Sequence, residues 1–336
     1  MLKVGVIGCG YWGPNLIRNF IQLRESDVVR VADLDESRLA HMKRLYPTVE
    51  TTVDYRDLLA DPQIDIVAVA TPVRTHFKLA SDALAAMKHV FVEKPITASV
   101  AEAQALIERA RADHLKLMVG HTFLYTGAVS KMKEIIDSGE LGQIYYVNTQ
   151  RLNLGLFQQD INVIWDLAPH DISIALYLLG QEPEAVCAMG ACHVNPAVED
   201  IAVVTLRFEG NLVAFIQSSW LDPDKIRKMT VVGSKKMMVY DDVQPMEKIR
   251  IYDKGVEKPK YYDTYAEFHY SYKYGDTLIP KIEGAEPLRT QLQHFLDCII
   301  NDKDPLTDGT SGLAVVKILE GAQRSLHEGN AWVKID

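Results

Sequence analysis

A glycine-rich turn near the start of the chain constrains the fold more than any other stretch. Its glycines, Gly8, Gly10 and Gly13, have the spacing G-x-G-x-x-G. Residues 3–7 before the turn form an apolar, strand-like run, and apolar residues recur at helical spacing over 16–20. In this context the first glycine permits a tight turn, the second leaves room for a pyrophosphate, and the third lets the helix pack closely on the strand. The helix N-terminus then points at the phosphates, so the pattern predicts a dinucleotide-binding unit.

An acidic residue follows at the distance that such a unit requires. Asp33 ends a second strand-like run, residues 28–32, and comes twenty residues after Gly13. A carboxylate here accepts hydrogen bonds from both hydroxyls of an adenosine ribose and repels a 2′-phosphate, which favours NAD over NADP. The alternative is that Asp33 or Asp35 only caps the helix that runs through residues 38–45.

Composition and charge narrow the class of protein. The 336 residues suffice for two domains, and the net charge of −9 argues against a nucleic-acid partner, which needs a basic face. No apolar run approaches the length of a membrane span, and the chain enters its first strand without room for a signal peptide. The four cysteines show neither a metal-ligand spacing nor a disulfide framework. We therefore expect a cytoplasmic protein with no metal site and no membrane association.

Residues 1–120 alternate between strand and helix patterns. Near-continuous apolar strands that alternate with amphipathic helices predict a doubly wound parallel sheet, the Rossmann arrangement, as an NAD-binding domain. Ligands of such sheets lie beyond the carboxyl ends of the strands. The strands are expected at residues 3–7, 28–32, 64–70, 89–92 and 116–119, with helices including 77–87 and 99–112.

Residues 121–336 have a different rhythm, which predicts an α+β domain for substrate binding and oligomerisation. Its sheet has one face covered by helices, and we expect a second subunit on the other. Expected helices are 127–138, 167–179, 288–300 and 310–327; expected strands are 143–151, 185–193, 201–208, 212–220, 227–232 and 237–240. Residues 253–286 are predicted to be irregular. Their six tyrosines suit either an interface or a stacking surface for a sugar or base.

Two short motifs carry candidate catalytic groups. In Glu93-Lys94-Pro95, at the end of a predicted strand, proline restricts the backbone of Lys94 and holds its ammonium at the ligand edge of the sheet. There it can stabilise a developing alkoxide, although an exposed surface lysine is the alternative. In the second motif Asp166 is expected to cap the helix 167–179, with His170 four residues on.

A carboxylate that orients an imidazole makes a general base near neutral pH. The alternative for Asp166 and His170 is an ordinary helix cap and a surface histidine. Taken with the predicted nicotinamide site, the groups indicate an oxidoreductase acting on an alcohol. His170 removes the hydroxyl proton as hydride leaves for NAD, Asp166 holds His170, and Lys94 stabilises the oxygen.

The ordered motifs resemble the Gfo/Idh/MocA oxidoreductase family over nearly the full length. They are V-G-V-I-G-C-G-Y-W-G at 4–13, A-D at 32–33, T-P at 71–72 with His76, E-K-P at 93–95 and D-x-x-x-H-D at 166–171. The resemblance implies a Rossmann domain and a second domain with a large, mostly antiparallel open sheet that forms homodimers or homotetramers. It implies catalytic roles for Lys94, Asp166 and His170, and a Lys94–Pro95 bond that is often cis in the family. The cofactor-binding residues that it implies are Gly8, Gly10, Tyr11, Trp12, Gly13, Asp33, Thr71, Pro72, His76, Glu93 and Lys94.

Within the family, G-Y-W-G-P-N, R-L-N-L-G at 151–155 and W-D-L-A-P-H are similar to nucleotide-sugar dehydrogenases. This implies NAD-dependent oxidation of a ring hydroxyl, at C3, of a nucleotide-activated amino sugar such as UDP-N-acetylglucosamine or its uronate. The implied substrate-binding residues are Lys94, Arg151, Asn153, Trp165, Asp166 and His170. Arg151, Arg227 and Lys228 can meet a diphosphate, or they are solvated surface charge. The alternatives are an inositol or free-sugar dehydrogenase and a non-catalytic NAD-binding regulator.

The sequence departs from the family pattern at two places beside the expected cofactor and substrate. Val73 stands where the family often has asparagine after T-P, and Ala168 with Pro169 stands where it often has glycine between the catalytic Asp and His. Neither departure removes a catalytic group.

Overall fold

The computed structural model describes residues 1–257 and 271–335, which divide into two compact units. The first unit contains Met1–Tyr125 and Ala285–Glu320, and the second contains Thr126–Gly284 and the chain from Gly321 onward. The sequence analysis placed all of 121–336 in one domain, so the assignment of 285–320 to the first unit differs from it. Helix α8 (Pro287–Ile300) explains the difference, because its apolar face is buried there and Phe295 packs 6.1 Å from the ring of Phe91.

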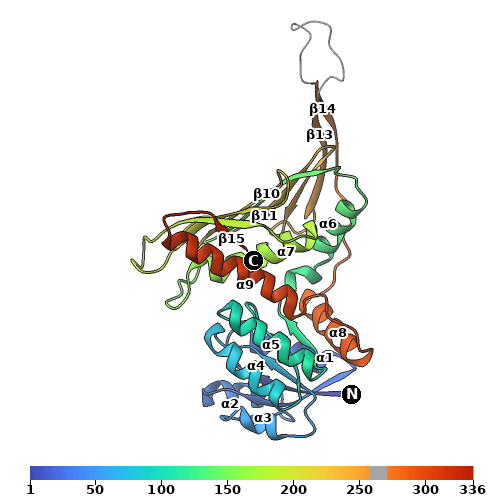
Figure 1. The fold of residues 1–336 in the computed structure, drawn as a ribbon. Coiled ribbons are helices and arrows are strands. Elements are labelled where there is room, and N and C mark those ends of the chain that lie inside the picture. Colours follow the sequence, from blue (N-terminus) through green and yellow to red (C-terminus); the bar gives the residue numbers. More distant parts are fainter. Residues whose placement is uncertain (258–270, 336) are drawn as a thin grey trace, which may run out of the picture. The chain divides into compact units, whose positions relative to one another are not determined.

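The first unit is built around a parallel sheet of six strands in the order β3-β2-β1-β4-β5-β6, which confirms the doubly wound arrangement. Figure 1 shows the helices of this unit around the sheet. Its strands are β1 (Leu2–Ile7), β2 (Ser26–Ala32), β3 (Glu50–Thr52), β4 (Ile66–Val69), β5 (His89–Val92) and β6 (Leu117–Val119). The short strand β3 was not predicted. It has no apolar run and its residues are largely exposed, so its sequence carries no strand pattern.

Helices cover the sheet of the first unit, and the strands between them are almost entirely buried. The helices are α1 (Gly13–Gln22), α2 (Glu36–Leu45), α3 (Arg56–Ala60), α4 (His76–Ala85), α5 (Val100–Ala112) and α8, with the short 3₁₀ turns η1 (Val73–Thr75) and η2 (Thr122–Tyr125). Such burial on both faces is what continuous apolar strands require. The order places the carboxyl ends of β1, β4, β5 and β6 along one edge.

The second unit contains, in the described residues, a sheet of nine strands in the order β14-β13-β12-β11-β7-β10-β9-β8-β15. Only β7 and β10 are parallel neighbours, so the sheet is mostly antiparallel, as expected. The strands are β7 (Ile144–Leu152), β8 (Ala185–Ala191), β9 (Ile201–Arg207), β10 (Val213–Ser219), β11 (Ile226–Gly233), β12 (Met237–Asp241), β13 (Ile249–Glu257), β14 (Ser271–Leu278) and β15 (Val333–Lys334). The helices are α6 (Gly127–Asp137), α7 (Val163–Leu179) and the end of α9 (Gly309–His327).

The prediction of an irregular segment over residues 253–286 was wrong in part. Strands β13 and β14 pair antiparallel across it. Every residue of β14 is exposed, so no buried face imposes the alternation by which a strand is recognised. Besides its six tyrosines the segment contains Phe268 and His269, and of these eight residues only Tyr272 and Tyr274 are described, both of them exposed. The others, Tyr261, Tyr262, Tyr265, Phe268, His269 and Tyr270, lie outside the described residues.

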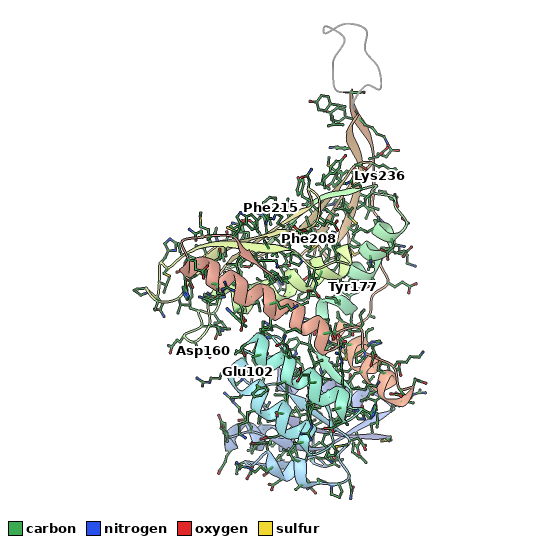
Figure 2. The ribbon with its side chains drawn as sticks, viewed as in Figure 1. Glu102, Asp160, Tyr177, Phe208, Phe215 and Lys236 are labelled. Atoms are coloured by element: carbon green, nitrogen blue, oxygen red, sulfur yellow. The ribbon has the colours of Figure 1, made fainter. Side chains whose placement is uncertain are left out.

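The two faces of the large sheet differ in what covers them. Ala214 and Ile216 of β10 are fully buried on the side that packs against α7. Phe215, between them, points to the opposite face, and Figure 2 shows it across the sheet from Tyr177 of α7. There Phe215 contacts the ring of Tyr146 and keeps 38% of its surface exposed. No described helix is long and apolar enough to cross a membrane.

Candidate functional site

The glycine turn has the geometry of a phosphate cradle. Gly8 has a φ of +98°, a conformation that side chains disfavour, and a Cβ at Gly13 would overlap the carbonyl oxygen of Gly8. A Cβ at Gly10, in contrast, would meet only the end of Arg38, so the backbone at this position faces open space. Helix α1 begins at Gly13 without a side-chain cap and without an acidic residue in its first turn. The turn therefore fits a dinucleotide pyrophosphate.

Asp33, at the end of β2, is bound to this turn. Its Oδ2 accepts a hydrogen bond from the backbone N–H of Cys9 at 2.6 Å, and its Oδ1 accepts one from Asp35 at 2.9 Å. Asp35, not Asp33, caps α2, so the capping alternative does not explain Asp33. Arg38 lies 3.7 Å from the Asp33 carboxylate. Beside them is a cavity of about 500 Å³, lined by Cys9, Gly10, Tyr11, Pro14, Ser37, Arg38 and His41.

Glu93 and Lys94 follow β5 directly, at the edge where the parallel strands end. The Lys94–Pro95 bond is cis, as the resemblance implied. Oε2 of Glu93 accepts a hydrogen bond from the backbone N–H of Lys94 at 3.3 Å, while Oε1 is enclosed by protein. Burial raises the pKa of Glu93 to about 7, against the opposing effects of the Lys94 charge and the nearby N–H of Trp12. A carboxyl group is thus held beside the lysine close to its protonation midpoint at neutral pH.

His76 connects the loop after β4 to the loop after β5. Its Nδ1 faces the carbonyl oxygen of Pro95 and its Nε2 faces that of Thr71, both at 2.8 Å. Its side chain is buried, and burial lowers the pKa of His76. Because both ring nitrogens already face protein carbonyls, the residue supports the Thr71-Pro72 and Lys94-Pro95 loops. Its predicted contact with the cofactor stays a prediction.

His121, directly after Gly120 at the end of β6, is a further buried polar residue at this edge, and the sequence analysis missed it. It is 1% exposed, and neither ring nitrogen has a hydrogen-bond partner among the described residues. Burial, with a smaller effect of the Lys94 charge, lowers the pKa of His121 to about 3, so the imidazole is neutral. The sequence feature that could have identified His121 was its position directly after the last predicted strand of the parallel sheet.

In the second unit, the predicted catalytic pair lies on α7, whose start was predicted wrongly. The helix begins at Val163, and the side chain of Asn162 caps it by accepting a hydrogen bond from the N–H of Trp165 at 3.2 Å. Asp166 is therefore in the first turn, not at the cap, and Pro169 lies inside the helix. Asparagine is a favoured capping residue. Asn162 and the apolar pair that follows it therefore formed the sequence pattern for the start of the helix, which the sequence analysis missed.

Asp166 and His170 nevertheless occupy one face of α7, four residues apart, and both are partly exposed. Oδ2 of Asp166 accepts a hydrogen bond from the indole Nε1 of Trp220 at 2.9 Å. Trp220 follows β10 and is 1% exposed. The sequence analysis did not select Trp220, which it placed at the end of the expected strand 212–220.

The predicted substrate residues of this unit have different surroundings. Arg151, on β7, is 5% exposed and donates two hydrogen bonds to Asp171, through Nε at 2.8 Å and Nη2 at 3.0 Å. Two of its guanidinium nitrogens thus already bind a protein carboxylate, which weakens the case for a diphosphate contact. Asn153 and Trp165 are partly exposed. Arg227 lies 3.5 Å from Asp242 and keeps about a third of its side chain exposed, at 37%.

Across residues 1–257 and 271–335, no group of three or more His, Cys, Asp or Glu side chains is placed to hold a metal ion.

Comparison with known proteins identifies the family of both parts of the chain. The model of the Gfo/Idh/MocA family described as "Oxidoreductase family, NAD-binding Rossmann fold" matches residues 2–121. The model of the Gfo/Idh/MocA C-terminal domain matches residues 129–239. Together the matches cover well over half of the 336 residues.

Individual relatives are similar over almost their whole length. The chain is 25% identical to myo-inositol 2-dehydrogenase of Thermotoga maritima, over 97% of each protein. It is 27% identical to UDP-N-acetylglucosamine 3-dehydrogenase of Acidithiobacillus ferrooxidans, over 94% of each. A solved structure of the latter enzyme superposes with a TM-score of 0.81 at 25% identity, and covers 98% of this chain and 99% of that one. The two substrate classes are equally close in sequence.

Proposed function

The chain belongs to the Gfo/Idh/MocA oxidoreductase family, and from this premise we propose that its substrate is a nucleotide-activated amino sugar. The family and the relatives make it an NAD(P)-dependent oxidoreductase that acts on hydroxyl groups of sugars or polyols. Our proposal is the finer one. The enzyme oxidises the C3 hydroxyl of UDP-N-acetylglucosamine or its uronate, with NAD as acceptor, to a 3-keto sugar.

The observation that carries the catalytic part of the proposal is the placement of Asp166 and His170 one turn apart on α7, with the carboxylate of Asp166 anchored by Trp220. The nucleotide-sugar substrate is supported by the similarity to UDP-N-acetylglucosamine 3-dehydrogenase. His170 takes the proton of the reacting hydroxyl, and Asp166 holds the imidazole in orientation and stabilises the imidazolium. The ammonium of Lys94 stabilises negative charge on the oxygen. The dinucleotide supplies the hydride acceptor when it is bound.

NAD is the proposed cofactor because of Asp33. Its carboxylate is fixed at the glycine turn by the N–H groups of Cys9 and Asp35, where a 2′-phosphate would meet a negative charge. Arg38, 3.7 Å away, favours a 2′-phosphate instead, since it is 52% exposed and can reach an anion. The carboxylate of Asp33 is held by two backbone N–H groups at the turn, so it favours NAD.

One observation favours a second candidate, an inositol or free-sugar dehydrogenase. Asp171 already engages Arg151, so a residue that was expected to meet a diphosphate has a partner within the protein. A free polyol needs no diphosphate contact. The relatives include enzymes of both kinds.

NADH absorbance separates the candidates. Purified protein with NAD is mixed in turn with UDP-N-acetylglucosamine, its uronate, free N-acetylglucosamine and myo-inositol. A rise with the UDP-sugars alone, including a stoichiometric burst without turnover, supports the proposal. A rise only with inositol or the free sugar overturns it in favour of polyol oxidation, and NADP as the better acceptor removes the cofactor assignment.

We also propose that the protein is a homodimer or homotetramer through the outer face of the large sheet. This face exposes Tyr146, Met189, Val203 and Phe215, from four different strands. Large apolar side chains side by side on a sheet face indicate a covered surface. Sedimentation velocity gives the mass in solution, and a monomer at micromolar concentration contradicts the proposal.

A further inference from the structure

In the second unit, the indole of Trp220 makes a hydrogen bond with one of the proposed catalytic residues. Its Nε1 donates to Oδ2 of Asp166 at 2.9 Å. We infer that Trp220 is a positioning residue, which sets the orientation of the Asp166 carboxylate and through it the basicity of His170. The inference rests on the proposed roles of Asp166 and His170 and goes beyond them, because Trp220 itself touches no reacting atom.

The main chain and the ring of Trp220 are fixed independently of Asp166. Its backbone N–H donates to the carbonyl oxygen of Asp200 at 2.9 Å, and its own carbonyl oxygen accepts from the N–H of Gly155 at 2.9 Å. The indole packs against Phe157, with ring centroids 5.6 Å apart and planes at 58°. With 1% of its surface exposed, the side chain has no space to rotate. The donor therefore stays in place when the carboxylate moves or changes charge.

The fixed indole holds one oxygen of the Asp166 carboxylate in a defined place. Asp166 lies in the first turn of α7 and is partly exposed. A bond from a fixed indole to Oδ2 selects the rotamer in which that oxygen faces β10. A hydrogen bond to a carboxylate is stronger than one between neutral groups, and a buried indole N–H without an acceptor is unfavourable. Both effects hold the pair together.

The bond also sets how strongly Asp166 attracts a proton on His170. A donor at Oδ2 withdraws negative charge from the carboxylate, so the imidazolium one turn away is stabilised less than it would be by an unshared carboxylate. Removal of the donor makes His170 harder to deprotonate. The active form of the enzyme, with the imidazole neutral, then appears only at higher pH.

Trp220→Phe tests this directly, because it removes the N–H and keeps an aromatic ring. With the substrate that the wild-type enzyme oxidises, we expect kcat to fall roughly ten- to a hundredfold. KM stays within about threefold, and the acid limb of the kcat/KM profile moves to higher pH. Trp332→Phe, the same substitution directly before β15, leaves the acid limb in place. An unchanged acid limb in Trp220→Phe overturns the inference.

A second measurement does not depend on activity. The chain has four tryptophans, so ¹H–¹⁵N spectra contain four indole N–H signals, and the signal lost in Trp220→Phe assigns Trp220. In Asp166→Asn we expect this signal alone to move and its exchange with solvent to accelerate. If it does not respond, the hydrogen bond does not exist in solution and the inference fails. If it responds but Asp166→Ala keeps full activity, the proposed function of the pair fails instead.

Discussion

Glu93 gives the structure its most specific pH dependence, and Glu93→Gln is the substitution that tests it. The carboxyl group lies at the end of β5 with Oε1 enclosed by protein, and burial raises its pKa from 4.5 to about 7. Glutamine has nearly the same shape but cannot ionise. The comparison therefore isolates the free energy of holding a charge at this position.

The sign follows from proton linkage. Because the native-state pKa of Glu93 is raised, the folded protein binds a proton that the unfolded chain releases between pH 4.5 and 7, and stability falls across this window as pH rises. At 1.36 kcal/mol per pH unit, the difference between 4.5 and about 7 corresponds to about 3 kcal/mol. The Gln variant lacks this loss. As pH rises through this window, the free energy of unfolding of the Gln variant should therefore increase by about 3 kcal/mol relative to that of the wild type.

The assay is urea unfolding at several pH values from 5 to 8.5, followed by fluorescence, with wild type and variant compared at each pH. Glu209→Gln, at an exposed turn, is the matched control and should give a difference that does not vary with pH. Parallel stability curves for wild type and Glu93→Gln would show that the buried carboxyl is ionised without cost. That result would refute the raised pKa of Glu93 and the protonated carboxyl that it places beside Lys94.

Three further predictions concern the two units separately. Lys94→Ala and His170→Ala should each lower kcat by 10²–10⁴, typical for loss of an acid–base or oxyanion partner, while NAD affinity from fluorescence titration changes by less than about threefold; full rates in both variants would contradict the catalytic roles. Asp33→Ala should weaken NAD binding and raise the ratio of NADP to NAD activity, and an unchanged ratio would remove Asp33 from the ribose site. Arg151→Met should lower the free energy of unfolding by about 3–5 kcal/mol, because it leaves the buried carboxylate of Asp171 without its partner; a loss below about 1 kcal/mol in urea titrations would mean that the ion pair contributes little.

The parallel sheet could be predicted from the sequence because its strands are buried on both faces. Burial of this kind leaves continuous apolar runs such as those of β1 and β4, and the glycine turn between strand and helix fixes where the ligand edge lies. Strands β3 and β14 could not be predicted in the same way. Neither has a buried face, so pairing with neighbours alone, which is set by tertiary structure, keeps them extended.

Lys94, Asp166 and His170 could be selected from the sequence as candidates, because their chemistry is visible in the residue type and in a short spacing; their catalytic roles stay predictions. Their partners could not be selected in this way. Trp220 lies 54 positions from Asp166 in the chain, and its indole N–H becomes relevant only when β10 packs beside α7. The same holds for Arg151, whose charge suggested an anionic ligand until the fold supplied Asp171.

The buried pair of Arg151 and Asp171 changes how substrate choice should be argued. The pair joins β7 to the residue that follows His170 on α7, so it ties the helix that carries the proposed base to the sheet. The fold requires this arginine whichever substrate is bound. Its presence in R-L-N-L-G therefore indicates how α7 is attached to the sheet and does not indicate a diphosphate ligand. Groups that distinguish a nucleotide sugar from inositol must therefore be sought among partly exposed residues such as Arg227. Arg227 lies on β11 opposite Arg151 in register, on the same face of the sheet, so a diphosphate contact there would leave the ion pair intact. Lys228, the next residue, points to the opposite face, which is the one proposed for subunit contact.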